Sequence, residues 1–347
     1  MSVMARMLLW LVSLLTFCKA SDVMKFQVFE ETEAETFVGD ISESSMVKAM
    51  ATNDNIKGEL RYEFQGSLQT YFGIDESTGI IRTATKIDRE NVSLGLVRDT
   101  FQIWVQASKG VVKAAIPTEI KILDINDNSP VFKEDIENIS VKESAPLGAE
   151  LLITVAEDLD IGNNSVQSYE IVDRNDDGAF DLKVSRPTSE FQVKLVVSKR
   201  LDREINDSYY LVIEARDGGS PPRIGRKGLS ITVLDSNDHF PKFSKDLYVG
   251  EVRENSRVGT FVLNVTATDK DIGTNGEVVY TLQVPPRYKD LFTLDARTGE
   301  LRTNATLDYE LAKDYQLQVT ARDKGPDSIP STAWIKVKVS VLCVLKV

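Results

Sequence analysis

Apolar and polar residues alternate one by one in several short segments of the chain. Residues 101–107 read Phe-Gln-Ile-Trp-Val-Gln-Ala, and residues 211–215 and 315–321 alternate in a similar way. Because successive side chains of a strand point to opposite faces, this alternation predicts strands with one buried face. No long segment after residue 20 has its apolar residues at helical spacing.

Two segments are typical of tight hairpin turns between such strands. Residues 74–80 and 294–300 each place Thr-Gly shortly after an Asp, and glycine readily adopts the positive φ that such turns need. Short strands with frequent turns are typical of antiparallel β-sandwiches. We therefore expect an all-β chain.

Three acidic strings recur with a period of about 110 residues. The first is Val-x-Glu, the second is Ile/Leu-Asp-x-Glu, and the third is Asp-x-Asn-Asp followed by a proline. The glutamates of the first string are Glu30, Glu143 and Glu254. A fixed period indicates a tandem of similar units, and 347 residues exceed what one core usually serves. We predict three modules, at 21–128, 129–239 and 240–347.

Residues 1–20 have the composition of a signal peptide. Arg6 precedes an apolar run at 7–17, which ends in Cys-Lys-Ala at 18–20. This run is too short to span a bilayer and is typical of a cleaved secretion signal. Cleavage would leave Cys343 without a partner for an intrachain disulfide. No later stretch is apolar enough for an anchor, so we expect extracellular modules and no membrane insertion by this chain itself.

The charge balance limits the classes of ligand that the chain can bind. The chain has 53 acidic and 41 basic residues, which argues against nucleic acid, because phosphate binding needs clustered Lys and Arg. The surplus fits bound cations or a solvated acidic surface. Calcium takes six to eight hard oxygens, and Asp-x-Asp in an extended strand puts both carboxylates on one side. A single histidine, His239, and no cysteine cluster argue against zinc. We expect His239 to be a linker residue that contributes its carbonyl oxygen; the alternatives are a switch or a ligand.

Together, Val-x-Glu, Asp-Arg-Glu, Asp-x-Asn-Asp-Asn-x-Pro, Asp-x-Asp and Ala-x-Asp resemble the extracellular repeat of the cadherin family. The resemblance covers nearly all of residues 21–347. It implies a tandem of three seven-stranded, Greek-key (immunoglobulin-like) β-sandwiches. It also implies about three Ca²⁺ ions at each junction between successive repeats.

The resemblance further implies the ligands of two junctions. For the first junction they are Glu30, Asp88, Glu90, Asn126, Asp127, Asp158, Asp160 and Asp217, with the carbonyl oxygens of Ile125, Asn128 and Asn164. For the second they are Glu143, Asp202, Glu204, Asn237, Asp238, Asp269, Asp271 and Asp323, with the carbonyl oxygens of Ser236, His239 and Asn275. Because the carboxylates repel one another when no cation is bound, we expect linkers that are flexible without calcium and rigid with it.

The two ends of the chain depart from the pattern. The first module has Asn-Asp-Asn at 53–55 in place of Asp-x-Asp, and Lys109 in place of the aspartate that ends Ala-x-Asp. The family uses those positions for the junction before a module, and the first module has no predecessor. Residues 339–347 replace the expected linker motif, so we expect no complete third site and a chain truncated or alternatively spliced before a fourth repeat.

Other signals are weaker. Residues 173–178 mimic the start of an EF-hand loop, but Val184 stands where that loop needs a glutamate, so we interpret them as a turn. Sequons fit a secreted protein. They occur at Asn91, Asn138, Asn163, Asn206, Asn264 and Asn304. We find no nucleophile elbow, phosphate loop or zinc-protease motif, so we expect no enzyme.

The resemblance implies calcium-dependent cell-cell adhesion, with homophilic pairing to another copy or a related cadherin on the apposed cell. Residues 21–30 lack the Trp of cadherins that exchange an N-terminal strand, and the Asp-Ile-Gly-x-Asn loops that begin at Asp160 and Asp271 are more similar to protocadherins. We expect the cell surface if the chain is part of an anchored parent, and secretion otherwise. The alternative is a soluble secreted ligand or decoy for another surface receptor.

Overall fold

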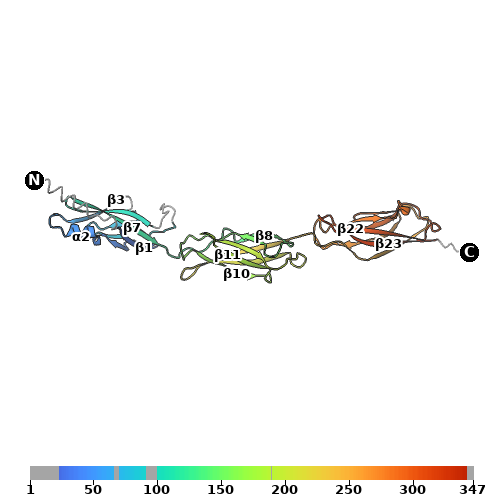
Figure 1. The fold of residues 1–347 in the computed structure, drawn as a ribbon, viewed down its shortest axis with the longest axis horizontal. Helices are drawn as coiled ribbons and strands as arrows, with labels where there is room; N and C mark the ends of the chain where they lie inside the picture. Colours follow the sequence, from blue (N-terminus) through green and yellow to red (C-terminus); the bar gives the residue numbers. More distant parts are fainter. Residues whose placement is uncertain (1–22, 66–69, 91–99, 189, 342–347) are drawn as a thin grey trace. The chain divides into compact units, whose positions relative to one another are not determined.

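A computed structural model describes residues 23–65, 70–90, 100–188 and 190–341 (Figure 1). The expected signal peptide, the sequon at Asn91 and Cys343 lie outside the described residues. Two compact units form. The first comprises Met1–Lys133, Val155–Tyr169 and Glu214–Arg226, and the second comprises Glu134–Thr154, Glu170–Ile213 and Lys227–Val347. Each candidate junction lies wholly within one of these units.

The first module is a sandwich of a four-stranded and a three-stranded sheet. The larger sheet has the order β1-β7-β6-β3, with β1 (Met24–Phe29), β7 (Val112–Leu123), β6 (Thr100–Lys109) and β3 (Leu60–Gln65). The smaller sheet has the order β2-β5-β4, with β2 (Phe37–Asp40), β5 (Ile80–Thr83) and β4 (Phe72–Ile74). Strand β1 runs parallel to β7, which brings the end of β1 beside the start of the following linker.

The second and third modules repeat this arrangement. In the second the orders are β10-β13-β14-β8 and β11-β12-β9, with β8 (Ile136–Lys142), β9 (Glu150–Ile153), β10 (Val166–Arg174), β11 (Phe180–Ser185), β12 (Gln192–Val197), β13 (Ser208–Asp217) and β14 (Ile224–Leu234). In the third they are β16-β23-β22-β19 and β17-β21-β20, with β16 (Leu247–Arg253), β17 (Phe261–Asn264), β19 (Val279–Gln283), β20 (Phe292–Leu294), β21 (Glu300–Thr303), β22 (Asp314–Arg322) and β23 (Ser331–Ser340). The third also has a ribbon of β15 (Lys242–Phe243) and β18 (Ala267–Thr268), and a 3-10 turn, η4 (Pro286–Tyr288). The predicted all-β tandem of seven-stranded sandwiches is confirmed.

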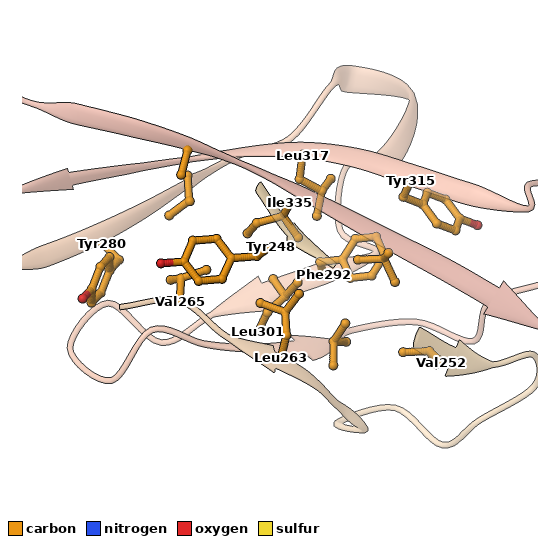
Figure 2. Close-up of a cluster of buried hydrophobic side chains, with 14 of the residues drawn as sticks. Tyr248, Val252, Leu263, Val265, Tyr280, Phe292, Leu301, Tyr315, Leu317 and Ile335 are labelled. Carbon is orange, nitrogen blue, oxygen red and sulfur yellow. The ribbon is translucent and has the colours of Figure 1, made fainter. Parts of the chain in front are cut away.

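The core of the third module shows how alternation builds each sandwich. Leu317 on β22 and Ile335 on β23 face Leu263 on β17 and Leu301 on β21 across the interior (Figure 2). Leu301, Leu317 and Ile335 have no exposed surface. Each such side chain contributes about 1.5–3 kcal/mol when fully buried. Phe292 adds a T-shaped contact, with its ring centroid 5.3 Å from that of Tyr315.

The predicted hairpin turns are confirmed. The Asp75 carboxylate accepts backbone N–H bonds from Ser77 and Thr78, each at 2.8 Å, and Gly79 has a φ of 79°. The turn at 294–300 is built in the same way around Asp295. Residues 173–178 also form a turn, because β10 ends at Arg174 and the Asp176 carboxylate accepts the backbone N–H of Phe180 at 2.8 Å.

The first module contains helical structure that the alternation does not predict. It comprises the 3-10 turn η1 (Ile41–Glu43) and helix α2 (Ser45–Ala51). The Ser44 hydroxyl caps α2 by accepting the N–H of Met46 at 3.3 Å, and Val47 and Met50 are its buried residues. A serine cap followed by this apolar spacing is the local signal for such a helix. Among the described residues, no helix has the length and apolarity that a membrane span requires.

A buried ion pair lies in the second module. The Lys227 side chain is 1% exposed, and its ammonium contacts the Glu137 carboxylate and the Thr154 hydroxyl. The same carboxylate accepts the Thr154 hydroxyl at 2.8 Å. Burial acts to raise the pKa of Glu137, but the bonds from Lys227 and Thr154 outweigh it and lower that pKa.

We predict that Glu137→Ala lowers the free energy of unfolding of this sandwich by about 3 kcal/mol, because it leaves a buried ammonium without its carboxylate. Hydrogen exchange of the β8 and β14 amides measures the change. The double variant Glu137→Leu/Lys227→Met removes both charges and should stay close to the native stability. The pKa of Glu137 in the folded state lies below its unfolded value of about 4.3, so the contribution of its charge to stability is present above that pH. This contribution is lost as the pH falls through the folded pKa. An acid-unfolding profile that is the same in the double variant as in the native protein would contradict this assignment.

Candidate metal centres

Glu30 forms hydrogen bonds with three backbone segments at the end of the first module. It follows β1, it is fully buried, and its backbone N–H bonds the Leu123 carbonyl at 3.0 Å. Its two carboxylate oxygens accept backbone N–H groups from Ile125 at 2.9 Å and from Arg89 at 2.8 Å. The carboxylate therefore fixes the loop at 87–90 against the start of the linker.

Around this anchor, acidic groups from distant parts of the chain converge. Ligand oxygens of Glu30, Asp88 and Glu90 all lie within 4.8 Å of one another. So do those of Glu90, Asp124 and Asp160. The structure thus brings the Val-x-Glu and Asp-x-Glu strings of the first module next to the Asp-x-Asp string of the second.

The linker residues complete this first centre. The Asn128 side-chain amide donates to Asp127 at 2.7 Å and to Asp160 at 2.8 Å. The backbone N–H of Asn128 also approaches Asp160, at 3.2 Å. The Asn126 side-chain NH₂ donates to the Pro221 carbonyl at 3.0 Å. Its side-chain oxygen, Oδ1, receives no hydrogen bond from a described residue.

The loops of the second module supply the other side of this centre. The Asp158 carboxylate accepts the N–H of Asp160 at 3.2 Å. Asp217, at the end of β13, is 3% exposed and accepts N–H groups from Gly219 and Arg223 on one oxygen only. Asn164 lies in the loop after Asp160, where its N–H bonds the Ile161 carbonyl at 3.1 Å.

Asp124 has a role that was not predicted from the sequence. It accepts the Ile161 N–H at 3.1 Å and the Asn164 amide at 2.9 Å, so it holds the loop that follows Asp160. Asp235 binds Ile272 and Asn275 in the same way in the second centre. The signal was present, since an aspartate opens both linker strings.

The arginine of each Asp-Arg-Glu string also lies in its centre. The Arg89 guanidinium donates to the Leu159 carbonyl at 2.9 Å and lies 2.5 Å from Asp124. Arg203 donates to the Lys270 carbonyl at 3.0 Å and to Asp235 at 2.5 Å. Each guanidinium therefore links the Asp-Arg-Glu loop to the first aspartate of its linker and to the Asp-x-Asp loop.

The second centre is built in the same manner from other residues. The Glu143 carboxylate accepts N–H groups from Ser236 at 2.6 Å and Arg203 at 2.9 Å. Ligand oxygens of Glu143, Asp202 and Glu204 lie within 4.8 Å of one another. A second group with the same limit combines Glu204, Asp238, His239 and Asp271.

The loops of the third module close this second centre. The Asp269 carboxylate accepts the N–H of Asp271 at 3.1 Å. Asp323 accepts the Asn237 amide at 3.1 Å and the Ser328 hydroxyl at 2.7 Å. Asn275 lies in the loop after Asp271, where its amide donates to Asp235 at 2.8 Å.

Burial and mutual repulsion make these carboxylates resist ionisation. Burial is the largest cause that raises the pKa of Glu90, Asp127, Asp158, Glu204 and Asp271. Neighbouring carboxylates raise these pKa values further. For Glu90 the neighbour is Glu30, and for Asp127 the neighbours include Glu30 and Asp160. A cation at either centre would remove this penalty.

Buried oxygens without a hydrogen bond are concentrated at these centres. No described residue donates a hydrogen bond to the buried oxygens Asn126 Oδ1, Asp158 Oδ2, Asp217 Oδ2, Asn237 Oδ1, Asp269 Oδ2 and Glu204 Oε2. Such groups are costly unless another partner binds them. All are hard oxygens of the type that calcium takes, so the residues present fit a calcium ion.

The corresponding residues of the first and third modules are arranged differently. The Lys109 ammonium donates to the Met50 and Ala51 carbonyls at 3.1 and 3.0 Å, at the end of α2. Within the described part of the chain, Glu254, Asp308 and Glu310 belong to no group of convergent metal-ligating side chains.

Comparison with known proteins agrees with this geometry. A model of the cadherin domain matches residues 137–234 and 248–340. Human Protocadherin-17 is 34% identical over 324 residues, which are 91% of this chain and 28% of that protein. Human Protocadherin gamma-A11 is 36% identical over 87% of this chain and 32% of its own length. The chain thus spans about a third or less of these relatives.

Solved structures give the same result. A structure of mouse clustered PcdhgC3 EC1-3 superposes with a TM-score of 0.77 at 30% identity, covering 92% of this chain and all of that one. A structure of Protocadherin Gamma B7 extracellular cadherin domains 1-4 gives a TM-score of 0.74 at 30% identity, covering 92% of this chain and 75% of that one. Sequence, fold and neighbours agree that the chain belongs to the cadherin family, with protocadherins among its relatives.

Proposed function

We propose that this chain is a calcium-dependent adhesion ectodomain of three repeats, at 21–128, 129–239 and 240–347. Cell adhesion is the function of the family. The observation that carries calcium dependence is the pair of matched centres, each with buried oxygens that no described residue satisfies. An acidic surface with only solvated carboxylates would not bury these oxygens beside one another.

The chain's own residues have distinct tasks in this proposal. Glu30 and Glu143 hold the linker and the Asp-Arg-Glu loop in register through backbone N–H bonds. Asp127 and Asp238 supply linker carboxylates, and the Asp-x-Asp loops supply those of the next repeat. Calcium, at about three ions per junction, would supply the positive charge that lets these carboxylates stay ionised side by side. We expect affinities of roughly 10⁻⁴–10⁻³ M, the range of extracellular modules.

We further propose homophilic pairing with another copy or a related cadherin on an apposed cell. The chain would be extracellular, at the cell surface as part of an anchored protein or otherwise secreted. Exposed sequons on the second and third repeats support an extracellular location; they are Asn138, Asn206, Asn264 and Asn304. Asn163 is also exposed, but it lies beside the first centre, where a glycan would crowd the metal ligands, so we expect it to carry none.

Asp127→Asn tests the first centre. At 1 mM calcium, an ion with a dissociation constant near 10⁻⁴ M stabilises the folded state by about 1.4 kcal/mol. The variant should lose a stabilisation of this order, because an amide replaces a linker carboxylate. Calcium titration of the thermal unfolding temperature measures the loss. Asp54→Asn changes an exposed aspartate of the same repeat and should behave as native; equal calcium shifts in all three proteins would refute the assignment.

Gly219→Ala tests the same centre without removing a carboxylate. A Cβ at Gly219 would lie 1.9 Å from the Asn126 side-chain nitrogen, so the Asn126 amide must move. We expect calcium affinity to fall by about tenfold, since a displaced ligand costs about 1.4 kcal/mol. Isothermal titration calorimetry measures it. Gly73→Ala is the control, because nothing lies within 4 Å of its Cβ position; native affinity in the Gly219 variant would show that Asn126 is not a ligand.

Bead aggregation tests homophily. Beads coated with this chain should aggregate in millimolar calcium and disperse on addition of a chelator. The Asp127→Asn variant should need more calcium to aggregate. If coated beads stay dispersed although calcium raises the unfolding temperature, calcium binding stands and homophilic adhesion by this chain does not. A soluble ligand for another receptor would then be the better interpretation.

A further inference from the structure

The two linkers differ at one side chain that faces the acidic groups. In the first centre the Asn128 amide lies 2.7 Å from Asp127 and 2.8 Å from Asp160. In the second centre the corresponding residue is His239, the only histidine of the chain. Its Nδ1 atom lies 2.9 Å from Asp238 and 3.1 Å from Asp271. The exchange places an imidazole nitrogen where the first centre has an amide.

A third carboxylate faces the same nitrogen. Glu204 Oε2 lies 3.6 Å from His239 Nδ1, and this buried oxygen accepts no hydrogen bond from a described residue. Other donors serve part of the cluster, since Arg203 bonds the other Glu204 oxygen and the His239 backbone N–H lies 3.3 Å from Asp271. One ring N–H cannot serve three carboxylates at once, so Glu204 Oε2 is left without a donor among the described residues. The Asp271 side chain has no exposed surface, and that of Glu204 is 13% exposed.

The distances from the His239 nitrogen to the three carboxylates suit a small tetrahedral cation, and all four ligand atoms lie within 4.8 Å of one another. With bonds of about 2.0–2.1 Å, adjacent ligand atoms of a zinc site lie about 3.3 Å apart. The three nitrogen–oxygen distances of 2.9, 3.1 and 3.6 Å bracket that value. Imidazole is a preferred ligand of zinc, copper and nickel, whereas calcium takes oxygen.

We infer that the second centre holds a site for a transition cation of the Zn²⁺ class, bound by His239 Nδ1 with Glu204, Asp238 and Asp271. This inference revises the expectation from the sequence, where a lone histidine argues against zinc. The first centre has no equivalent, because Asn128 lacks a ring nitrogen. Three of these residues are also proposed calcium ligands. Zinc would therefore displace calcium from the second junction alone, and this competition, unlike the zinc site itself, rests on the proposed function.

Nuclear magnetic resonance of the single imidazole tests the site directly. The chain is prepared without a polyhistidine tag, in a Cys343→Ser background, and freed of metal with a chelator. We expect Zn²⁺ to shift the His239 Nδ1 resonance and to saturate at one equivalent. Calorimetry should give zinc affinity at least about tenfold weaker for His239→Asn, since one of four ligands is lost.

Two variants test the assignment, one by removing the imidazole and one by adding an imidazole to the first centre. His239→Asn installs the residue that the first linker already uses, so its fold should be kept, as circular dichroism can show. Asn128→His should create a second zinc-responsive imidazole beside Asp127 and Asp160. An unshifted His239 resonance, or equal zinc affinity in native and His239→Asn protein, would overturn the inference.

Calcium competition separates this inference from the proposed function. Millimolar calcium should weaken zinc binding in the native protein, and micromolar zinc should lower the calcium-induced rise of the unfolding temperature. If zinc shifts the imidazole but calcium has no effect on stability, the zinc site stands and the calcium proposal fails. If calcium stabilises the chain but zinc leaves the imidazole unchanged, the reverse holds.

Discussion

The arrangement of each centre depends on a buried glutamate whose two oxygens hold two backbone segments. Glu30 accepts N–H groups from Ile125 and Arg89, and Glu143 does the same for Ser236 and Arg203. Parallel pairing of β1 with β7 and of β8 with β14 makes this possible, since the end of one strand lies beside the start of the linker. These bonds, together with the contact of each arginine to the first linker aspartate, fix the Asp-Arg-Glu loop against the linker.

That anchor imposes an electrostatic cost. Carboxylates that are close together and buried have raised pKa values, and the arginines Arg89 and Arg203 compensate only part of the negative charge. Backbone N–H groups serve some oxygens but leave others in each centre without a donor. The arrangement is therefore poor as a hydrogen-bond network and good as a ligand set for a hard cation. The residues whose ionisation is costly without a cation are therefore the same residues that a cation would bind.

Much of this could be predicted from the sequence because the signals are local. Alternation at 101–107 and 315–321 reports directly on which side chains are buried, and the acidic strings recur at one period. The prediction missed what depends on tertiary contacts. Helix α2 has only two buried residues, Val47 and Met50, so its local signal is weak, and Asp124 and Arg89 gain their roles only when distant loops meet. Glu214 occupies an outward position of its strand, yet it is 2% exposed, because Arg216 and Arg226 cover its carboxylate.

The two centres also provide a comparison within one chain. They share the anchor glutamate, the arginine and the first linker aspartate, so a difference between them has few causes. Asn128 offers its amide to two carboxylates, and His239 offers a ring nitrogen to three. Under the proposed function this position contributes only its backbone carbonyl oxygen, so different side chains there would leave a calcium site unaltered. The side chain would then be free to differ between the centres, which is how the inferred zinc site can occur in the second centre alone.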